Sequence, residues 1–283
     1  MRGTEKSSMS IKIIADSLSD LNEQLCALYE AKIVPIFLHL DGKSYEDNGK
    51  LDKRSFLDDM RAAQKITSSC PPPGMYFDAF TEAKESYAVT VSSNLSGSYG
   101  SAMTGRELAE AEGAAVHVFD SKSASAGEAL VVRKLYDLLK QGVERVNLIG
   151  AMESFIKDMK TYFVLENLAN LQKNGRLHRI TERLVSILGI KLLMGSDGDG
   201  NIAFFSYARG EKQVLQKLAD TVEQSGKNTE GESAVISHCN NLPLAQKLAD
   251  AISERYRFRE VLVLPTSCAS SMYANEGGVV LAF

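Results

Sequence analysis

Four short segments of the chain combine serine and threonine hydroxyls with small or acidic residues. They are residues 16–20 (DSLSD), 67–74 (TSSCPPPG), 92–99 (SSNLSGSY) and 120–127 (DSKSASAG). Hydroxyls and the backbone amides of a helix N-terminus are groups that hold an anion without a full positive charge. Because these residues are also ordinary in turns and helix caps, each segment alone is compatible with a structural role. Taken together, they predict a site for a small anionic ligand.

The elements that position these segments follow a regular pattern in the first half of the chain. Short apolar runs, each followed by small polar residues and a helix-like stretch, lie at residues 11–15, 33–38, 88–91 and 116–119. This alternation predicts a first α/β domain, residues 10–155, with a mostly parallel sheet flanked by helices. Ser19 or Asp20 is expected to cap a helix over residues 21–29. Ligands of such sheets bind beyond the carboxyl ends of the strands, so the four hydroxyl-rich segments should line one rim.

The second half predicts a smaller α/β (α+β) domain, residues 156–283. Residues 162–166 are either a strand or the start of a helix that runs through Leu171. The turn at residues 195–201 (GSDGDGN) has the composition of a β-hairpin connection. Further helices are expected at residues 211–224 and 244–256, and further strands at residues 233–237, 260–264 and 279–283. The boundary near residue 155 carries no linker signal.

Composition excludes several classes of protein. The 283 residues are 44% hydrophobic and 24% charged, and their formal charge is −4, which gives no general attraction to nucleic acid or anionic membranes. No run reaches the ~18 apolar residues of a membrane span. The first nine residues lack the apolar stretch of a signal peptide, and Met9 is a plausible alternative start. Four scattered cysteines, without a C-x-x-C pair, indicate reduced thiols and a cytoplasmic location, and the four histidines show no metal-ligand spacing.

Catalytic motifs are largely missing. The chain has no G-x-S-x-G elbow, and neither a dinucleotide-binding nor a P-loop glycine motif stands at a strand–helix junction. The segment from Asp197 begins like a calcium loop, but Ile202 and Ala208 occupy the positions of the glycine and the glutamate, so we interpret it as a turn. One enzymatic alternative stays open: a hydrolase or transferase that acts on a small phosphorylated or acylated substrate through Asp16, Ser93 and Asp120.

At the hydroxyl-rich segments the sequence resembles the DegV family of bacterial fatty-acid-binding proteins, over nearly the whole chain from about Ser10. The motifs that carry the resemblance are A-D-S at 15–17, S-S-C-P-P-P-G at 68–74, S-S-N-L-S-G-S-Y at 92–99, D-S at 120–121 and L-A-N-L-Q-K-N-G-R at 168–176. The resemblance implies a two-domain α/β protein that holds one long-chain fatty acid between its domains. It implies no catalysis by the chain itself and no cofactor or metal.

The resemblance also implies which residues hold the ligand. The fatty-acid carboxylate is expected on Ser68, where relatives usually have threonine, and on Ser93. The further candidates for ligand binding are Thr67, Ser92, Asn94, Arg176 and Tyr273. The acyl chain needs an apolar tunnel, for which the candidates are Leu165, Leu168, Leu184, Ile187, Leu188, Phe204 and Phe205.

Two departures from the family pattern concern a possible partner. In relatives that serve a fatty-acid kinase, a separate dihydroxyacetone-kinase-like protein phosphorylates the bound acid. Relatives often carry a histidine near the head group where this chain has Tyr273, and Asn174 replaces a glycine before Gly175. Arg176 is expected either in a salt bridge with an acid such as Glu166 or near the pocket mouth, where a guanidinium would stabilise an acyl phosphate.

Overall fold

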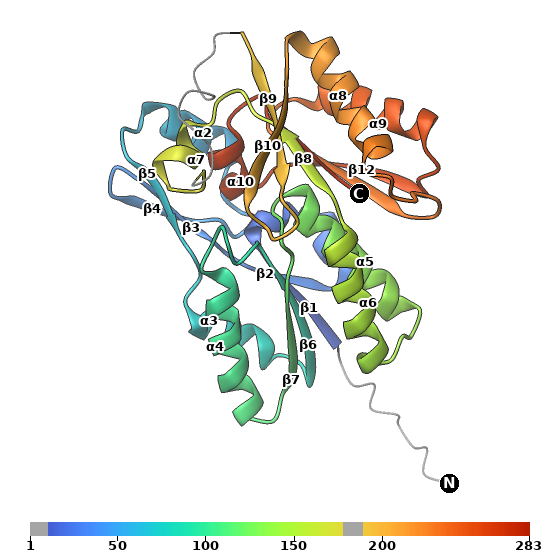
Figure 1. Cartoon of the computed structure of the whole chain (residues 1–283). Coiled ribbons are helices and arrows are strands. Elements are labelled where there is room, and N and C mark those ends of the chain that lie inside the picture. The colour runs from blue at the N-terminus through green and yellow to red at the C-terminus, as the bar shows by residue number, and fades with distance from the viewer. Residues whose placement is uncertain (1–10, 178–188) are drawn as a thin grey trace.

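The structure is a computed structural model of the chain, and it describes residues 11–177 and 189–283 (Figure 1). Its first sheet is parallel throughout, in the order β2-β1-β6-β7. The four strands are β1 (Ile11–Asp16), β2 (Ala31–Val34), β6 (Glu85–Thr90) and β7 (Ala115–Asp120). Most residues of the two central strands, β1 and β6, are buried, as expected for a parallel sheet that helices cover. The predicted parallel sheet is confirmed.

Helices cover both faces of this sheet. On one face, α3 (Pro73–Phe80) and α4 (Ser98–Ala111) pack against each other and against the strands. On the other face lies α5 (Ala126–Lys140), backed by α6 (Arg145–Asp158). The short 3-10 helix η1 (Ser17–Ser19) follows β1, and α1 (Glu23–Tyr29) leads to β2.

The expected strand at residues 33–38 is wrong, because the chain breaks there into two strands of different sheets. β2 ends at Val34, and β3 (Phe37–Leu40) belongs to a small antiparallel sheet with β4 (Lys43–Glu46) and β5 (Ile66–Ser69). Pro35 lies at the break, where its missing N–H ends strand pairing. The helix α2 (Lys53–Ala62) connects β4 to β5.

The second half builds a mixed six-stranded sheet in the order β10-β9-β8-β13-β11-β12. Its strands are β8 (Thr161–Val164), β9 (Lys191–Ser196), β10 (Ile202–Ala208), β11 (Ser233–His238), β12 (Glu260–Pro265) and β13 (Val279–Ala282). Only β11 and β12 pair in parallel, and β9 and β10 form the predicted hairpin. Two helices, α8 (Gly210–Gln224) and α9 (Leu242–Arg255), pack on this sheet. Two shorter helices, α7 (Ala169–Lys173) and α10 (Cys268–Ala274), lie near the small sheet (Figure 1).

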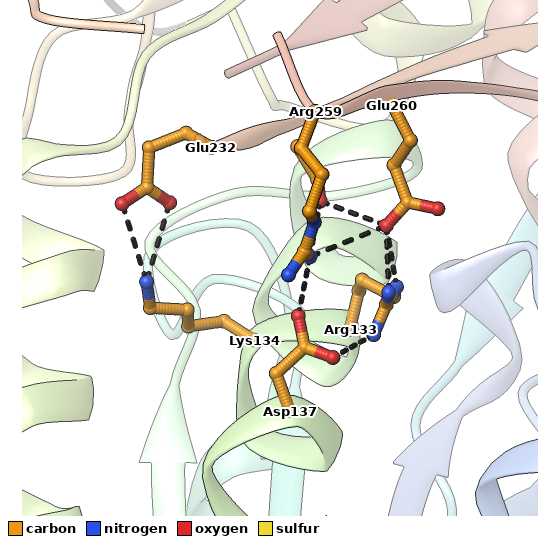
Figure 2. Close-up of polar contacts among 7 residues, drawn as sticks. Arg133, Lys134, Asp137, Glu232, Arg259 and Glu260 are labelled. Atoms are coloured by element: carbon orange, nitrogen blue, oxygen red, sulfur yellow. Dashed lines mark hydrogen bonds and ion pairs between the residues drawn. The ribbon is translucent and has the colours of Figure 1, made fainter. Parts of the chain in front are cut away.

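Helix α5 joins the two halves because it contacts both large sheets, β1 and β6 on one side and β11 and β13 on the other. Its residues 126–132 are all buried, as is typical of a helix that is enclosed on every side. At its far end Arg133 and Asp137 form ion pairs with Glu260 and Arg259, at 2.7 Å for Arg133–Glu260 and 2.6 Å for Arg259–Asp137 (Figure 2). Because α5 packs on both sheets, its contacts do not assign it to one domain alone. The domain boundary near residue 155 stays a prediction.

Three local expectations are settled by the structure. Asn22, rather than Ser19 or Asp20, caps α1: its side chain accepts a hydrogen bond from the Leu25 amide at 2.9 Å. Residues 162–166 contribute to strand β8, which ends at Val164, and the helical alternative for them is wrong. Residues 67–69 of the hydroxyl-rich segment 67–74 belong to strand β5, which pairs with β3, so this segment starts in the small antiparallel sheet instead of after a strand of the parallel sheet.

Candidate functional site

A pocket of about 900 Å³, a volume that includes its mouth, lies between the first sheet and the second. All four hydroxyl-rich segments reach it, through Leu18, Ser68, Ser96 and the residues 122–125. Three of the segments follow β1, β6 and β7 of the parallel sheet, as predicted, whereas Ser68 reaches the pocket from β5 of the small antiparallel sheet, so the expectation that all four lie on one rim of the parallel sheet is wrong for that segment.

The wall of the pocket is mainly apolar and comes from both halves of the chain. The first half contributes Leu18, Ile36, Val91, Leu95 and Ala124, and the second half contributes Phe163, Leu165, Leu171, Ile202 and Val280. Of the residues expected to form an acyl tunnel, Leu165 lines the pocket, Leu168 is buried elsewhere in the core, Phe204 is half-buried and Phe205 is exposed. Leu184, Ile187 and Leu188 lie outside the described residues.

Three of the expected binding residues meet in the pocket. Ser68 comes from β5, Tyr273 from α10 and Arg176 from the turn after α7. The hydroxyl oxygens of Ser68 and Tyr273 are 2.7 Å apart, and the Arg176 guanidinium lies 5.6 Å from the centre of the Tyr273 ring. We call Ser68, Tyr273 and Arg176 the polar cluster. Two hydroxyls at this spacing can donate to the same carboxylate, and the nearby guanidinium favours its negative charge.

The turn that carries Arg176 is fastened to the small sheet. Gly175 has a φ of +71°, which lets the chain reverse after α7. The Asn174 side chain donates to the carbonyl of Ile66, the first residue of β5, at 3.1 Å. Arg176 Nε donates to the Leu95 carbonyl at 3.2 Å, whereas Glu166, the expected acid partner, pairs with Lys191 instead. The expected Arg176–Glu166 salt bridge is therefore wrong, and the guanidinium borders the pocket.

Other hydroxyls on the pocket wall bond to protein groups. The Ser123 and Thr161 hydroxyls lie 2.8 Å apart, and the Ser125 hydroxyl donates to the carboxylate of Asp20. The Ser123–Thr161 pair is bonded in the same way as Ser68 and Tyr273, but the polar cluster also has the Arg176 guanidinium 5.6 Å from the Tyr273 ring centre. The polar cluster is therefore the part of the wall best suited to an anion.

The remaining expected binding residues lie outside the pocket wall. Thr67 is half-buried on β5, and Ser93 is exposed, with its amide donating to Asp120 at 3.1 Å. Ser92 is buried, and its hydroxyl donates to the Gly200 carbonyl at 2.8 Å. The Asn94 side chain donates to the Asp199 carbonyl, also at 2.8 Å. Their roles in ligand binding stay predictions.

The two aspartates of the enzymatic alternative accept hydrogen bonds from backbone amides. Asp16 is fully buried and accepts hydrogen bonds from the amides of Leu18 and Val91, both at 3.0 Å. Asp120 accepts from the amides of Ser93 and Lys122. Within the described ranges, no hydrogen bond joins the Ser93 hydroxyl to either carboxylate, so the geometry gives this serine no general base.

A group of buried acids lies behind the pocket wall. Burial raises the pKa of Asp16 to about 6, and it also raises the pKa of Asp20. Glu128, on α5, is fully buried, and both its carboxyl oxygens lack a hydrogen-bond partner at normal distance. Burial, and then the negative charge of Asp16, raise the pKa of Glu128 well above its ordinary value. Sequence reasoning missed Glu128, because a glutamate in the first turn of a helix is common.

Fold and site together define a class: an α/β binding protein whose inter-sheet pocket suits a ligand with an anionic end and an apolar body. Within the described residues, no helix is long and apolar enough to cross a membrane, and no group of His, Cys, Asp and Glu has the arrangement of a metal site.

The chain belongs to the DegV family: the model described as an uncharacterised protein of that family matches residues 10–283. A DegV domain-containing protein of Streptococcus pneumoniae is 32% identical over 280 residues, which are 97% of this chain and 99% of the relative. Among solved structures, a DegV family protein from Ruminococcus gnavus, refined with vaccenic acid, is 34% identical and has a TM-score of 0.92, with 97% of this chain and 100% of that chain covered. The fatty acid kinase B3 protein of S. pneumoniae, loaded with linoleic acid, is 30% identical with a TM-score of 0.88, over 97% and 99% of the two chains. The resemblance found in the sequence is confirmed.

Proposed function

We propose that this protein binds one long-chain fatty acid in the inter-sheet pocket and performs no chemistry on it. The observation that carries the proposal is an apolar pocket with the polar cluster on its wall. The relatives from R. gnavus and S. pneumoniae, described with vaccenic and linoleic acid, support the same class of ligand.

The two parts of the ligand would bind by different physics. Each methylene moved from water to the apolar wall gains about 0.8 kcal/mol, so the acyl chain supplies most of the affinity. The carboxylate would bind at the polar cluster, where Ser68 and Tyr273 donate and Arg176 supplies positive charge. Ser93 stays a predicted second donor, one that would have to turn its exposed hydroxyl inward.

A kinase partner is part of the proposal. The S. pneumoniae relative is named as a component of a fatty acid kinase, and the polar cluster would present the carboxylate to such an enzyme. Arg176 then stabilises the acyl phosphate more than the free acid, because the phosphate carries more negative charge. A cytoplasmic location, expected from the four unpaired cysteines, fits this role.

The test begins with protein purified from a bacterial host. Mass spectrometry after denaturation should detect a bound fatty acid. After delipidation, calorimetric titration should show that oleic acid binds about tenfold more tightly than its methyl ester, because the ester has no charge. Ser68→Ala should reduce this difference. Ser206→Ala should not, because Ser206 is a half-buried serine outside the pocket wall whose hydroxyl accepts a hydrogen bond from Lys217. Equal affinity for acid and ester would remove the head-group assignment, and the absence of any bound lipid would contradict the function.

A further inference from the structure

The turn between β9 and β10, residues 197–201, crosses from the second sheet to the loops of the first. Figure 1 shows this hairpin extending toward the first sheet. Three hydrogen bonds fasten it: Ser92 Oγ donates to the Gly200 carbonyl, Asn94 Nδ2 donates to the Asp199 carbonyl, and Ser196 Oγ donates to the Lys122 carbonyl at 3.2 Å. Gly200 itself lines the pocket. The turn therefore closes one side of the pocket.

The turn is stiff within itself. The Asp197 carboxylate accepts from the amides of Asp199 and Asn201, at 2.9 and 3.0 Å, and from the Asn201 side chain. The Asp197 amide donates back to the Asn201 carbonyl at 3.0 Å. A turn braced in this way moves as a unit, so its attachment to the opposite loops decides whether it lies over the pocket.

The loops that face the turn, which follow β6 and β7, are held in place by their own hydrogen bonds. The Ser92 amide donates to the Ser123 carbonyl at 2.7 Å, and Asp120 accepts from the amides of Ser93 and Lys122. Gly200 fits closely against these loops, because a Cβ added there would lie 2.3 Å from Ser92 Oγ and 3.0 Å from the Lys122 Cα. Gly198, in the same turn, has open space around the corresponding position.

We propose that residues 197–201 form a lid over the pocket and that Ser92 and Asn94 are positioning residues that hold it closed. The lid sets the rates at which a lipid enters and leaves. This inference rests on the proposed function, since it takes the pocket to be the lipid site. It gives Ser92 and Asn94 a role through the lid instead of direct contact with the carboxylate.

The experiment compares two glycines of the lid. Both have positive φ, +95° at Gly198 and +91° at Gly200, so alanine brings similar backbone strain at each. Only Gly200→Ala places a methyl group against Ser92 and Lys122. In stopped-flow displacement of cis-parinaric acid by excess oleate, Gly200→Ala should release the probe about tenfold faster than Gly198→Ala, and its uptake should also be faster.

A second pair of variants, at Asn94, tests the loop that holds the lid. Asn94→Asp removes the donor to Asp199 at an exposed position, so folding should be preserved, and Asn94→Gln restores an amide donor. Asn94→Asp should speed release of the acid and its methyl ester alike, and Asn94→Gln should be closer to wild type. If only the acid is affected, Asn94 contacts the carboxylate and its positioning role is overturned.

The outcomes separate the two proposals. Equal release rates for Gly200→Ala and Gly198→Ala, in protein that binds the probe, overturn the lid alone. A wild-type protein that does not bind cis-parinaric acid contradicts the proposed function.

Discussion

The polar cluster makes a specific prediction for Tyr273. Its hydroxyl is 2.7 Å from that of Ser68, and its ring lies beneath the Arg176 guanidinium. Tyr273→Phe keeps the ring and removes one donor to a charged acceptor, so oleic acid should bind about 1–3 kcal/mol more weakly. Calorimetric titration checks this, with the methyl ester as a control that should change less. An unchanged affinity for the acid would place the carboxylate elsewhere in the pocket.

The buried acids predict an unusual dependence of stability on pH. The folded-state pKa of Asp16 and of Glu128 is raised by burial, with Asp20 and the Tyr76 hydroxyl also facing this group. A raised pKa means that the folded chain keeps protons that the unfolded chain has already released. The free energy of unfolding should therefore fall as pH rises from the unfolded value of each acid to its folded value: from about pH 4 to 6 for Asp16, and from about pH 4.5 upward for Glu128.

Glu128→Gln tests this directly, since the amide keeps the shape and cannot ionise. Urea unfolding near pH 5 and near pH 8 should show that wild type loses stability with rising pH and that the variant loses less. Parallel pH profiles for the two proteins would show that Glu128 does not hold its proton in the folded state.

Residue types and motifs predicted part of the site. Ser68, Arg176 and Tyr273 were expected from the resemblance, and all three line the pocket. Ser92 and Asn94 were expected near the ligand, but the sequence does not reveal that their partners are carbonyls more than a hundred residues away, on a hairpin of the other half. The apolar wall residues Leu18 and Ile36 were missed, because their side-chain types are those of any core.

At the scale of elements, the first turn of α5 packs closely against the pocket wall at Gly127. A methyl group on Gly127 would lie 2.0 Å from Ser123 Oγ and 2.6 Å from Thr161 Oγ1, both on the pocket wall. Gly127→Ala should therefore lower the free energy of unfolding by about 1–3 kcal/mol and weaken lipid binding. Gly150→Ala, in α6 with open space around it, should instead raise stability by about 0.5–1 kcal/mol. Urea unfolding of both variants measures these changes. If Gly127→Ala leaves the free energy of unfolding unchanged, α5 can shift to make room for the methyl group without losing stability, and the prediction is wrong.

Strands with a clear local pattern could be predicted from the sequence. The order of the strands in the second sheet could not. The runs that became β1, β6 and β7 are short, apolar and followed by turn residues. By contrast, β13 comes last in the chain yet lies between β8 and β11. Such an order depends on long-range antiparallel pairing, for which local patterns give no signal. Pro35 signals a break between two strands, but because it lies within an apolar run, the pattern favoured one continuous strand over residues 33–38.

At the scale of the whole molecule, the two large sheets are joined by α5 and share one pocket. The helix packs on both sheets, and the ion pairs at its far end hold it to β12 (Figure 2). The hydroxyl-rich rim of the parallel sheet faces the second sheet across the pocket. A lipid held between them would contact both halves and should stabilise the folded chain as a unit.

The most direct test of this account is a crystal structure of the protein purified from a bacterial host without delipidation. We expect elongated density through the inter-sheet pocket, with its forked end within hydrogen-bond distance of the Ser68 and Tyr273 hydroxyls. A pocket that holds only ordered water, or a lipid whose carboxylate lies far from Ser68, Tyr273 and Arg176, would contradict it.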